Sequence, residues 1–541
     1  MPASVGGKDK THPRRPFVAQ SEWSSLAGRP GPASDTRMNA DASSDRAEVH
    51  MALLKRIGFP PRPSVTATRR GPDREASLRA LLLAPVLLLV FFFGGARPWI
   101  RQGVSGLFFI CLGLWLFRHE LPAPGKNAWR LAPLACLVLL APLLQTIELP
   151  AALLQALSPI RAQWSGALLQ FADMSRTAVS YDVLATRTHL AWWIFLAVFA
   201  TLLHMALDSR ATEFPDWLLR LLFTLAATQA LYGVAQILLP SLGVLWDHHP
   251  SSGLAYKGFA RGTFINRNHF AAFLGLIWPL LAGHILILKS SQAREETRGR
   301  REAARILLPR QAFGIFCLAL IMLALVFSQS RGGILAALFS LVIFQFFAGL
   351  RRKRVAGVLT ACWIIVLGYG AVIGFDDLAG RFQQIGQGAS GRLEMWRDGW
   401  QAALDHPLTG TGLGTYPEVA RAYQNALGPG QRASHAHNDY LETLVELGFP
   451  AAGALIAGIW GLWCTRAALL WRARKTMDPD RLLLAAASLA ALGGYLLHGW
   501  VEFNNAIPAN QLTAVIIATF HVRVAEHGLR ESVTARLPVA S

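Results

Sequence analysis

The chain has 541 residues, of which 53% are hydrophobic and 16% charged, and its formal net charge is +19. Globular proteins average about 25% charged residues, whereas here apolar runs of about 17–25 residues recur, the length that crosses a bilayer as a helix. This composition excludes an ordinary water-soluble domain, and the positive charge does not indicate nucleic-acid binding because no base-reading motif accompanies it.

The first 77 residues differ in composition from the rest of the chain. They are rich in Pro, Ser, Gly and Arg and have no periodic apolar spacing. Such a segment cannot bury a core, so we expect a disordered basic tail. No apolar stretch begins before about Leu78, and the tail therefore lacks the pattern of a cleaved signal peptide.

The apolar runs that follow predict an all-α polytopic membrane protein with about twelve transmembrane helices. The expected spans lie near residues 78–96, 100–117, 131–149, 189–207, 217–239, 267–288, 311–328, 332–349, 355–375, 448–466, 482–500 and 509–526. We therefore expect one membrane domain at 78–526 and a short cytoplasmic tail at 527–541.

The Lys and Arg content of the short loops predicts the orientation of these spans. Seven, four and five basic residues occur at 289–310, 351–354 and 466–481. Only two, one and none occur in the opposite loops near 97–101, 329–331 and 501–508. The basic loops should face the cytoplasm, which places the largest loop, 376–447, in the periplasm.

That loop is too long to be a simple turn, so we expect it to be helical in part and functional. Within it, Leu393, Trp396, Trp400 and Leu404 fall on one helical face. The following TGTGLGTY resembles a nucleotide loop, but no strand precedes it. Tight turns that glycine permits are the better interpretation.

The stretch SHAHNDYLETLVELGFP at 434–450 predicts a short amphipathic helix along the membrane surface. Its inner face is formed by His437, Leu441, Leu444, Val445 and Gly448. We expect His437 in the first turn, and Gly448 with Pro450 should end the helix and start the next span. Glu442 and Glu446 then form a solvated edge.

Three interpretations of the histidines remain open. The spacing of His435, His437 and Asp439 resembles a zinc motif, but such a site needs further ligands from a folded soluble domain, and the five cysteines of the chain show no metal-type spacing. A neutral imidazole can instead act as a general base. The simplest alternative is a histidine hydrogen-bonded at a helix start.

Arginines lie at the same predicted outer boundary. Arg261 precedes the sixth span, Arg267 begins it next to Asn268, and Arg331 occupies the tight hairpin between two spans. Snorkelling can explain Arg267, but it fits Arg331 less well. Because the planar guanidinium suits a diphosphate, the arginines with a histidine base suggest transfer of a sugar from a polyprenyl diphosphate.

These residues resemble the O-antigen ligase family, which also contains bacterial polysaccharide polymerases. The family motif of His, then Asn, Ser or Gln, nine residues and Gly is matched by His437, Asn438, residues 439–447 and Gly448. The segments RGTFINRN and SRGG are also similar to family segments, and the likeness covers most of residues 78–525.

The resemblance implies a GT-C-like membrane glycosyltransferase in the bacterial inner membrane, with its active site facing the periplasm. A glycan would pass from undecaprenyl diphosphate to an acceptor hydroxyl without a nucleotide-sugar, a metal or another cofactor. His437 would be the base or the acceptor-positioning residue, and Arg261 and Arg331 would bind the diphosphate. Supporting roles are possible for Arg267, Asn268, Asn438, His435 and Glu502, and helix-end capping and packing is the favoured interpretation of Glu502.

Several functions fit this pattern. Ligation onto lipid A-core is the leading interpretation, and polymerisation of repeat units or glycosylation of a protein would look the same in sequence. A transporter of lipid-linked sugar is the alternative from another class, but we find neither internal repeats nor mid-span polar residues. A structural subunit of an envelope complex would have no use for the outward His and Arg.

Overall fold

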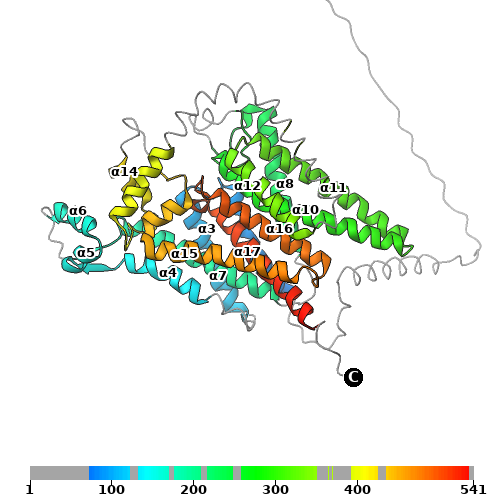
Figure 1. Cartoon of the computed structure of the whole chain (residues 1–541), viewed down its shortest axis with the longest axis horizontal. Coiled ribbons are helices and arrows are strands. Elements are labelled where there is room, and N and C mark those ends of the chain that lie inside the picture. The colour runs from blue at the N-terminus through cyan, green and yellow to red at the C-terminus, as the bar shows by residue number, and fades with distance from the viewer. Residues whose placement is uncertain are drawn as a thin grey trace, which may run out of the picture. The chain divides into compact units, whose positions relative to one another are not determined.

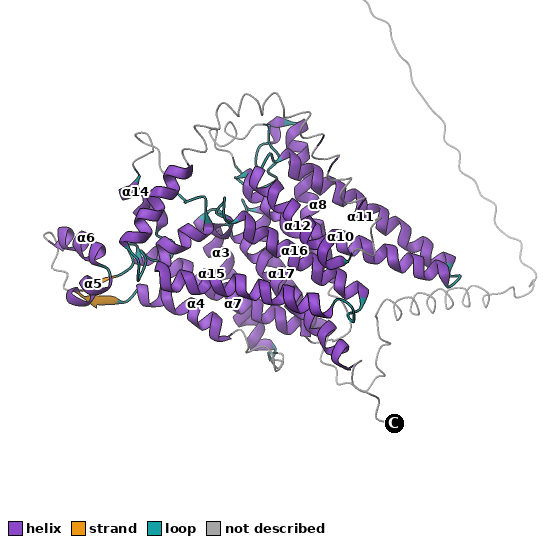
Figure 2. Cartoon of the chain, in the orientation of Figure 1, coloured by secondary structure: helices purple, strands orange, loops and turns teal. Residues whose placement is uncertain are grey.

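Long helices dominate the computed structural model (Figures 1 and 2). It describes residues 72–121, 132–169, 176–208, 216–247, 258–349, 392–424 and 434–534, together with residues 357, 364 and 368. All of them belong to one unit of contacts, Arg62–Ser541. The predicted tail and the predicted span at 355–375 fall largely or wholly outside the described residues.

The described elements follow one another in a simple order. The helices are α2 (Pro72–Phe91), α3 (Pro98–Arg118), α4 (Ala132–Gln145), α5 (Ala151–Leu157), α6 (Pro159–Leu169), α7 (Val183–Asp208), α8 (Asp216–Leu238), α10 (Arg267–Thr297), α11 (Arg301–Phe327), α12 (Arg331–Ala348), α14 (Tyr416–Tyr423), α15 (Asp439–Ala473), α16 (Pro479–His498) and α17 (Pro508–Thr534). Residues 392–405 are also helical. Short 3₁₀ turns occur at η2 (Pro240–Leu242) and η4 (Asn504–Ala506). Two strands, β1 (Glu148–Pro150) and β2 (Arg176–Ala178), pair antiparallel with Leu149 opposite Thr177.

Eight of these helices are long and apolar enough to cross a membrane. They are α3, α7, α8, α10, α11, α12, α15 and α16, and each overlaps one predicted span. The expectation of an all-α polytopic membrane protein is therefore confirmed. Helices α2, α4 and α17 lie at three further predicted spans without meeting the same measure, so the number twelve stays a prediction.

Helix α2 begins earlier than the sequence pattern indicates. It starts at Pro72, so residues 72–77 are helical and the expected boundary of a disordered tail at residue 77 is wrong. Proline is well suited to a first helical turn because its fixed φ matches the helix and its missing N–H would be unpaired there.

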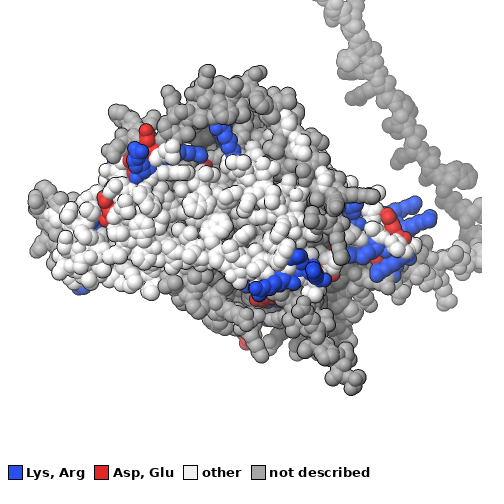
Figure 3. Space-filling view, viewed as in Figure 1, with Lys and Arg blue, Asp and Glu red and all other residues white. Residues whose placement is uncertain are grey.

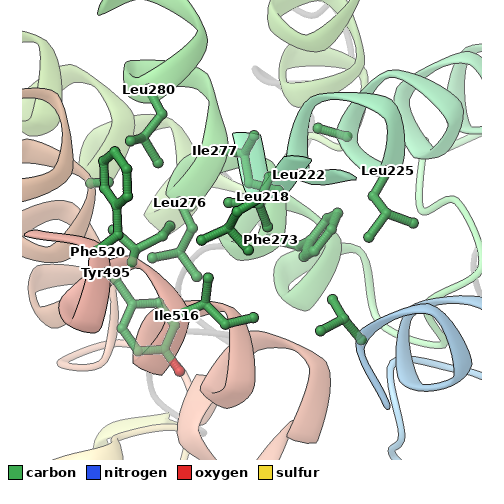
Figure 4. Packing of buried hydrophobic residues seen from close by; sticks show 14 of the residues in the cluster. Leu218, Leu222, Leu225, Phe273, Leu276, Ile277, Leu280, Tyr495, Ile516 and Phe520 are labelled. Carbon is green, nitrogen blue, oxygen red and sulfur yellow. The ribbon is translucent and has the colours of Figure 1, made fainter. Parts of the chain in front are cut away.

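The core is built around α10, of whose span window 78% is buried, against 17% for α15. Phe273, Leu276 and Leu280 of α10 pack with apolar side chains of α8, α16 and α17 (Figure 4). Helix α12 approaches α16 so closely that a Cβ at Gly494 would meet the hydroxyl of Ser340. Close packing through small residues is typical of helices in lipid, and α15 is left with a mostly lipid-accessible surface.

Lys and Arg gather where the topology requires them. In Figure 3 basic side chains gather at the end of the α10–α11 hairpin, at the lower edge and near α14, whereas the middle of the visible face carries few charges. Arg294, Arg298 and Arg300 belong to this end, and Arg294 pairs with Asp480 at 2.8 Å. An uncharged band with charged side chains at its edges agrees with a membrane helix bundle.

At the opposite end, the glycine-rich segment forms a hydrogen-bonded junction. The backbone φ angles of Gly410, Gly412 and Gly414 are all positive, which confirms the prediction of tight turns. Gly412 N donates to the Glu446 carbonyl at 3.0 Å. The side chain of Gln145 also donates to that carbonyl, at 2.7 Å. The junction therefore fixes α4 and the turn segment to α15.

Helix α15 has a kink at Gly448, where φ is 73°. The predicted break of the helix at Gly448 is thus confirmed, and the placement of its first part along the membrane surface stays a prediction. A Cβ at Gly448 would lie 2.7 Å from the Leu408 carbonyl oxygen, and the backbone there, with ψ of 166°, lies in a region essentially restricted to glycine that costs another residue on the order of 1–3 kcal/mol.

We expect Gly448→Ala to lower the melting temperature and the yield of folded protein, measured by thermal unfolding and size-exclusion chromatography in detergent. Gly453→Ala is the matched control on the same helix, because nothing lies within 4 Å of its added Cβ. Equal stability of the two variants would show that the kink tolerates a side chain.

Candidate functional site

The segment before α15 positions the predicted histidines. Asn438 is the N-cap, and its side-chain oxygen accepts from Tyr440 N and Leu441 N, both at 3.1 Å. Such a cap satisfies helix N–H groups that otherwise have no partner. His437 precedes the cap with φ of 49°. The expectation that His437 lies within the first helical turn is therefore wrong, because the helix starts two residues later.

His437 is hydrogen-bonded to a buried carboxylate. Its Nδ1 lies 2.7 Å from Oε1 of Glu502, whose side chain is 2% exposed, whereas the His437 side chain is 29% exposed. The other oxygen, Oε2, accepts from the side-chain amide of Asn268. Arg392 approaches Oε2 at 3.7 Å. The start of α10, the segment before α15 and the α16–α17 turn thus meet at one carboxylate.

The charge state of Glu502 decides which nitrogen of His437 carries the proton. Burial alone would raise the pKa of Glu502, but the hydrogen bond from His437 and the charges of His269, His437 and Arg392 lower it to about 2. An ionised carboxylate can only accept, so in a neutral imidazole of His437 Nδ1 carries the hydrogen and Nε2 holds the lone pair. Because the folded pKa lies below the unfolded value, this contribution to stability is present above about pH 4.5 and is lost as the pH falls toward 2.

The ring of Phe503 contacts the rings of the histidines in this site. His435 stacks on its ring at 4.1 Å, and His437 and His269 meet it edge-on at 4.8 and 4.5 Å. Nδ1 of His435 is 2.8 Å from Oε1 of a second carboxylate, Glu442. Each predicted histidine is therefore held between a carboxylate and the same ring.

Glu446 does not form part of a solvated edge as expected. It is 7% exposed, and its Oε1 accepts from Tyr416 N at 3.1 Å. The sequence pattern misassigned it because the turn segment 408–416 covers the helix side that would otherwise face water. Glu442, half-buried, is occupied by His435 and by Ala436 N.

The SRGG turn lies next to the same α16–α17 turn. Gly332 allows this approach, since a Cβ there would be 2.9 Å from Val501 Cγ2 and 3.0 Å from His498 Nε2. Arg331 is the exposed first residue of α12. It follows Ser330, whose hydroxyl caps the helix by accepting from Gly333 N.

Arg261 and Arg267 lie on the segment that leads into α10. Ala260 N donates to the Phe327 carbonyl at 2.9 Å, which joins this segment to the end of α11, just before the SRGG turn. Arg261 is 4% exposed, and its own N–H donates to Gln236 of α8 at 3.1 Å. The guanidinium of Arg267 lies over the Phe259 ring at 3.9 Å.

Among the predicted residues, the hydrogen bonds thus bring together His437, Asn268 and Glu502. His435 joins them through Phe503, and Asn438 is the cap beside them. Sequence reasoning missed Phe503, His269 and Arg392. Phe503 and His269 could have been found from the sequence, because each directly follows a predicted site residue. No feature of the sequence around Arg392 indicates a role in the site.

A family model described as O-antigen ligase matches residues 316–456. The match runs from within α11 through the SRGG turn, the 392–405 helix and the histidine segment to α15. No curated protein matches the chain.

Proposed function

We propose that this chain, which belongs to the O-antigen ligase family through residues 316–456, transfers a glycan from undecaprenyl diphosphate to an acceptor hydroxyl. The observation that carries the proposal is the hydrogen-bonded group of His437, Glu502 and Asn268 beside the SRGG turn. A histidine oriented by a buried carboxylate and half-open to its surroundings has the arrangement of a general base.

In the proposed reaction, Nε2 of His437 accepts the proton of the acceptor hydroxyl. The acceptor oxygen forms a bond to the anomeric carbon while the bond from that carbon to the diphosphate oxygen breaks. The bonding electron pair leaves with the diphosphate, and a single displacement inverts the anomeric centre. Glu502 stabilises the imidazolium that forms, as an adjacent carboxylate favours a cation.

Arginines are proposed to stabilise the departing diphosphate. Arg331 is exposed at the N-terminus of α12, where helix N–H groups and the helix dipole also favour an anion. Arg261 and Arg267 lie on the segment bonded to the end of α11, just before the SRGG turn, and would complete the diphosphate site. Because arginine supplies the electrostatic stabilisation, the proposal needs no metal.

We further propose that the membrane domain lies in the bacterial inner membrane and that His437 faces the periplasm. The basic end of α10–α11 supports this orientation. Lipid A-core is the proposed acceptor. The GT-C-like arrangement and the periplasmic loop at 376–447 belong to the same proposal.

A deletion strain examined for its surface glycans tests the function. Loss of long glycan from lipopolysaccharide, with accumulation of lipid-linked polymer, is the result expected for the ligase. Lipopolysaccharide capped with a single repeat would identify a polymerase, and a lipid-linked intermediate retained on the cytoplasmic face would identify a transporter. Unchanged glycans would contradict the proposal in all its forms.

Glu502→Gln is expected to reduce turnover by a large part of the roughly 10²–10⁴-fold that a general base provides. Glutamine keeps the size of the side chain but cannot balance the charge of a protonated imidazole. The acid limb of the pH–rate profile should therefore also move. Glu418→Gln is the control, since Glu418 is an exposed residue of α14 whose carboxylate forms an ion pair with Arg421. A pH profile identical to wild type would leave Glu502 with a packing role.

A further inference from the structure

The helix at 392–405 has three distinct faces. Small residues face the protein core, with Ala402 and Ala403 at most 1% exposed. Charged and polar residues such as Glu394 and Gln401 are exposed. Between these faces runs an apolar stripe that remains uncovered: Leu393 is 62%, Trp400 48% and Leu404 49% exposed, and Leu408 beyond the helix end is 55% exposed.

This apolar stripe adjoins the membrane-facing part of α15. The Trp400 ring meets Phe449 edge-on at 5.8 Å, and Phe449 is the first residue after the kink. Phe449 N also donates to the Pro407 carbonyl at 2.8 Å. The exposed side chains therefore continue the lipid-accessible surface of α15 past the point where its span begins.

The direction of the helix suits a membrane surface. In Figure 1 the 392–405 segment, yellow and next to α14, crosses the direction of α15 instead of running along it. A helix that crosses the spans, with one apolar, one charged and one protein-bound face, has the pattern of an interfacial helix. Tryptophan is enriched at this level of a bilayer.

We propose that the 392–405 helix lies in the bilayer interface on the His437 side, with Leu393, Trp400, Leu404 and Leu408 inserted among the lipids. The occupant of the apolar stripe is bilayer lipid, because the stripe is continuous with the α15 surface that lipid covers. Burying these side chains removes apolar surface from water, which favours the arrangement.

The same helix contacts the candidate site, so its position in the membrane affects the position of the histidines. Trp396 Nε1 donates to the Ala436 carbonyl at 3.0 Å, one residue before His437. Arg392 donates to the Val501 carbonyl at 3.4 Å and approaches Glu502 at 3.7 Å. An interfacial helix would therefore set the height of His437 and Glu502 relative to a lipid-anchored substrate.

Spin-label accessibility in vesicles of phosphatidylethanolamine and phosphatidylglycerol tests the inference without reference to catalysis. The full chain, with its five cysteines replaced by alanine, carries a nitroxide at Leu393→Cys, Leu404→Cys or, as the control, Glu394→Cys. We expect collisions with oxygen to exceed those with an aqueous nickel complex at 393 and 404, and the reverse at 394. Equal, water-like values at all three positions would overturn the proposal.

A second measurement uses the protein with its native cysteines left in place. Lipids brominated near the head-group end of their chains should quench part of the tryptophan fluorescence of the wild-type protein, and Trp400→Phe should remove a share of that quenching. An unchanged quenched fraction would place Trp400 outside the bilayer. Because neither measurement depends on turnover, loss of the proposed transferase activity and loss of this interface are separable results.

Discussion

His437→Ala is expected to reduce glycan transfer by roughly 10²–10⁴-fold, the contribution of a positioned general base. The variant removes the proton acceptor but leaves Glu502 and the Asn438 cap in place. Transfer is measured with purified protein, lipid-linked donor and acceptor in detergent or nanodiscs. The loss should appear in turnover and not in donor binding, since the imidazole acts on the acceptor hydroxyl.

Two controls separate chemistry from folding. Because Ala leaves space beside Glu502, free imidazole should restore part of the activity, with a dependence on imidazole concentration that the wild type lacks. His119→Ala, outside the site and half-buried against Trp115, should transfer normally. If purified His437→Ala matched wild type, another group would have to be the base.

Hydropathy was sufficient to predict the long helices because bilayer thickness fixes both the length and the apolarity of a span. It was less suited to α2, whose first turn is polar, and to α17, whose length includes charged residues such as Arg523. Local propensity cannot decide these cases, because burial against neighbouring helices determines where the helix begins.

In the candidate site, too, some features follow from the local sequence and others depend on the folded structure. The helix start at Asn438 and the kink at Gly448 follow from local rules, since a cap and a left-handed glycine each depend on only a few adjacent residues. The partners of His437 depend on folding. Glu502 lies 65 positions away from His437 and Asn268 lies 234 positions from Glu502, so no periodicity of the chain connects them.

The same reason explains the two wrong assignments in the histidine segment. Helical periodicity placed His437 inside the helix and Glu446 on its solvent-exposed face. Tertiary contacts decide otherwise: Asp439 N donates outside the helix to the Gly499 carbonyl at 2.8 Å, and the glycine-rich turns cover Glu446. A pattern of charges on a helix predicts exposure only where no other segment packs on that face.

Arg331→Ala is expected to lower transfer by the roughly 2.7–4 kcal/mol that one preorganised electrostatic donor contributes to a transition state, which is about 10²–10³-fold in rate. The neighbouring Gly332 packs against Val501 and His498, and Val501 directly precedes the carboxylate that orients His437, so the charge of Arg331 is proposed to act near the leaving group. Arg331→Lys keeps the charge but loses the planar fork that binds a diphosphate through two parallel hydrogen bonds. Its activity should therefore fall between wild type and Arg331→Ala.

The control for this loss is Arg305→Ala, an exposed arginine in the first turns of α11 at the basic end of the α10–α11 hairpin. This variant also removes one positive charge, but at the end of α11 that is far from the SRGG turn, so it should leave turnover unchanged. Turnover, donor affinity and thermal stability are compared for the three variants. If Arg331→Ala and Arg305→Ala had the same activity, the diphosphate would have to be bound by other residues, and Arg261 and Arg267 on the adjoining segment would be the next to substitute.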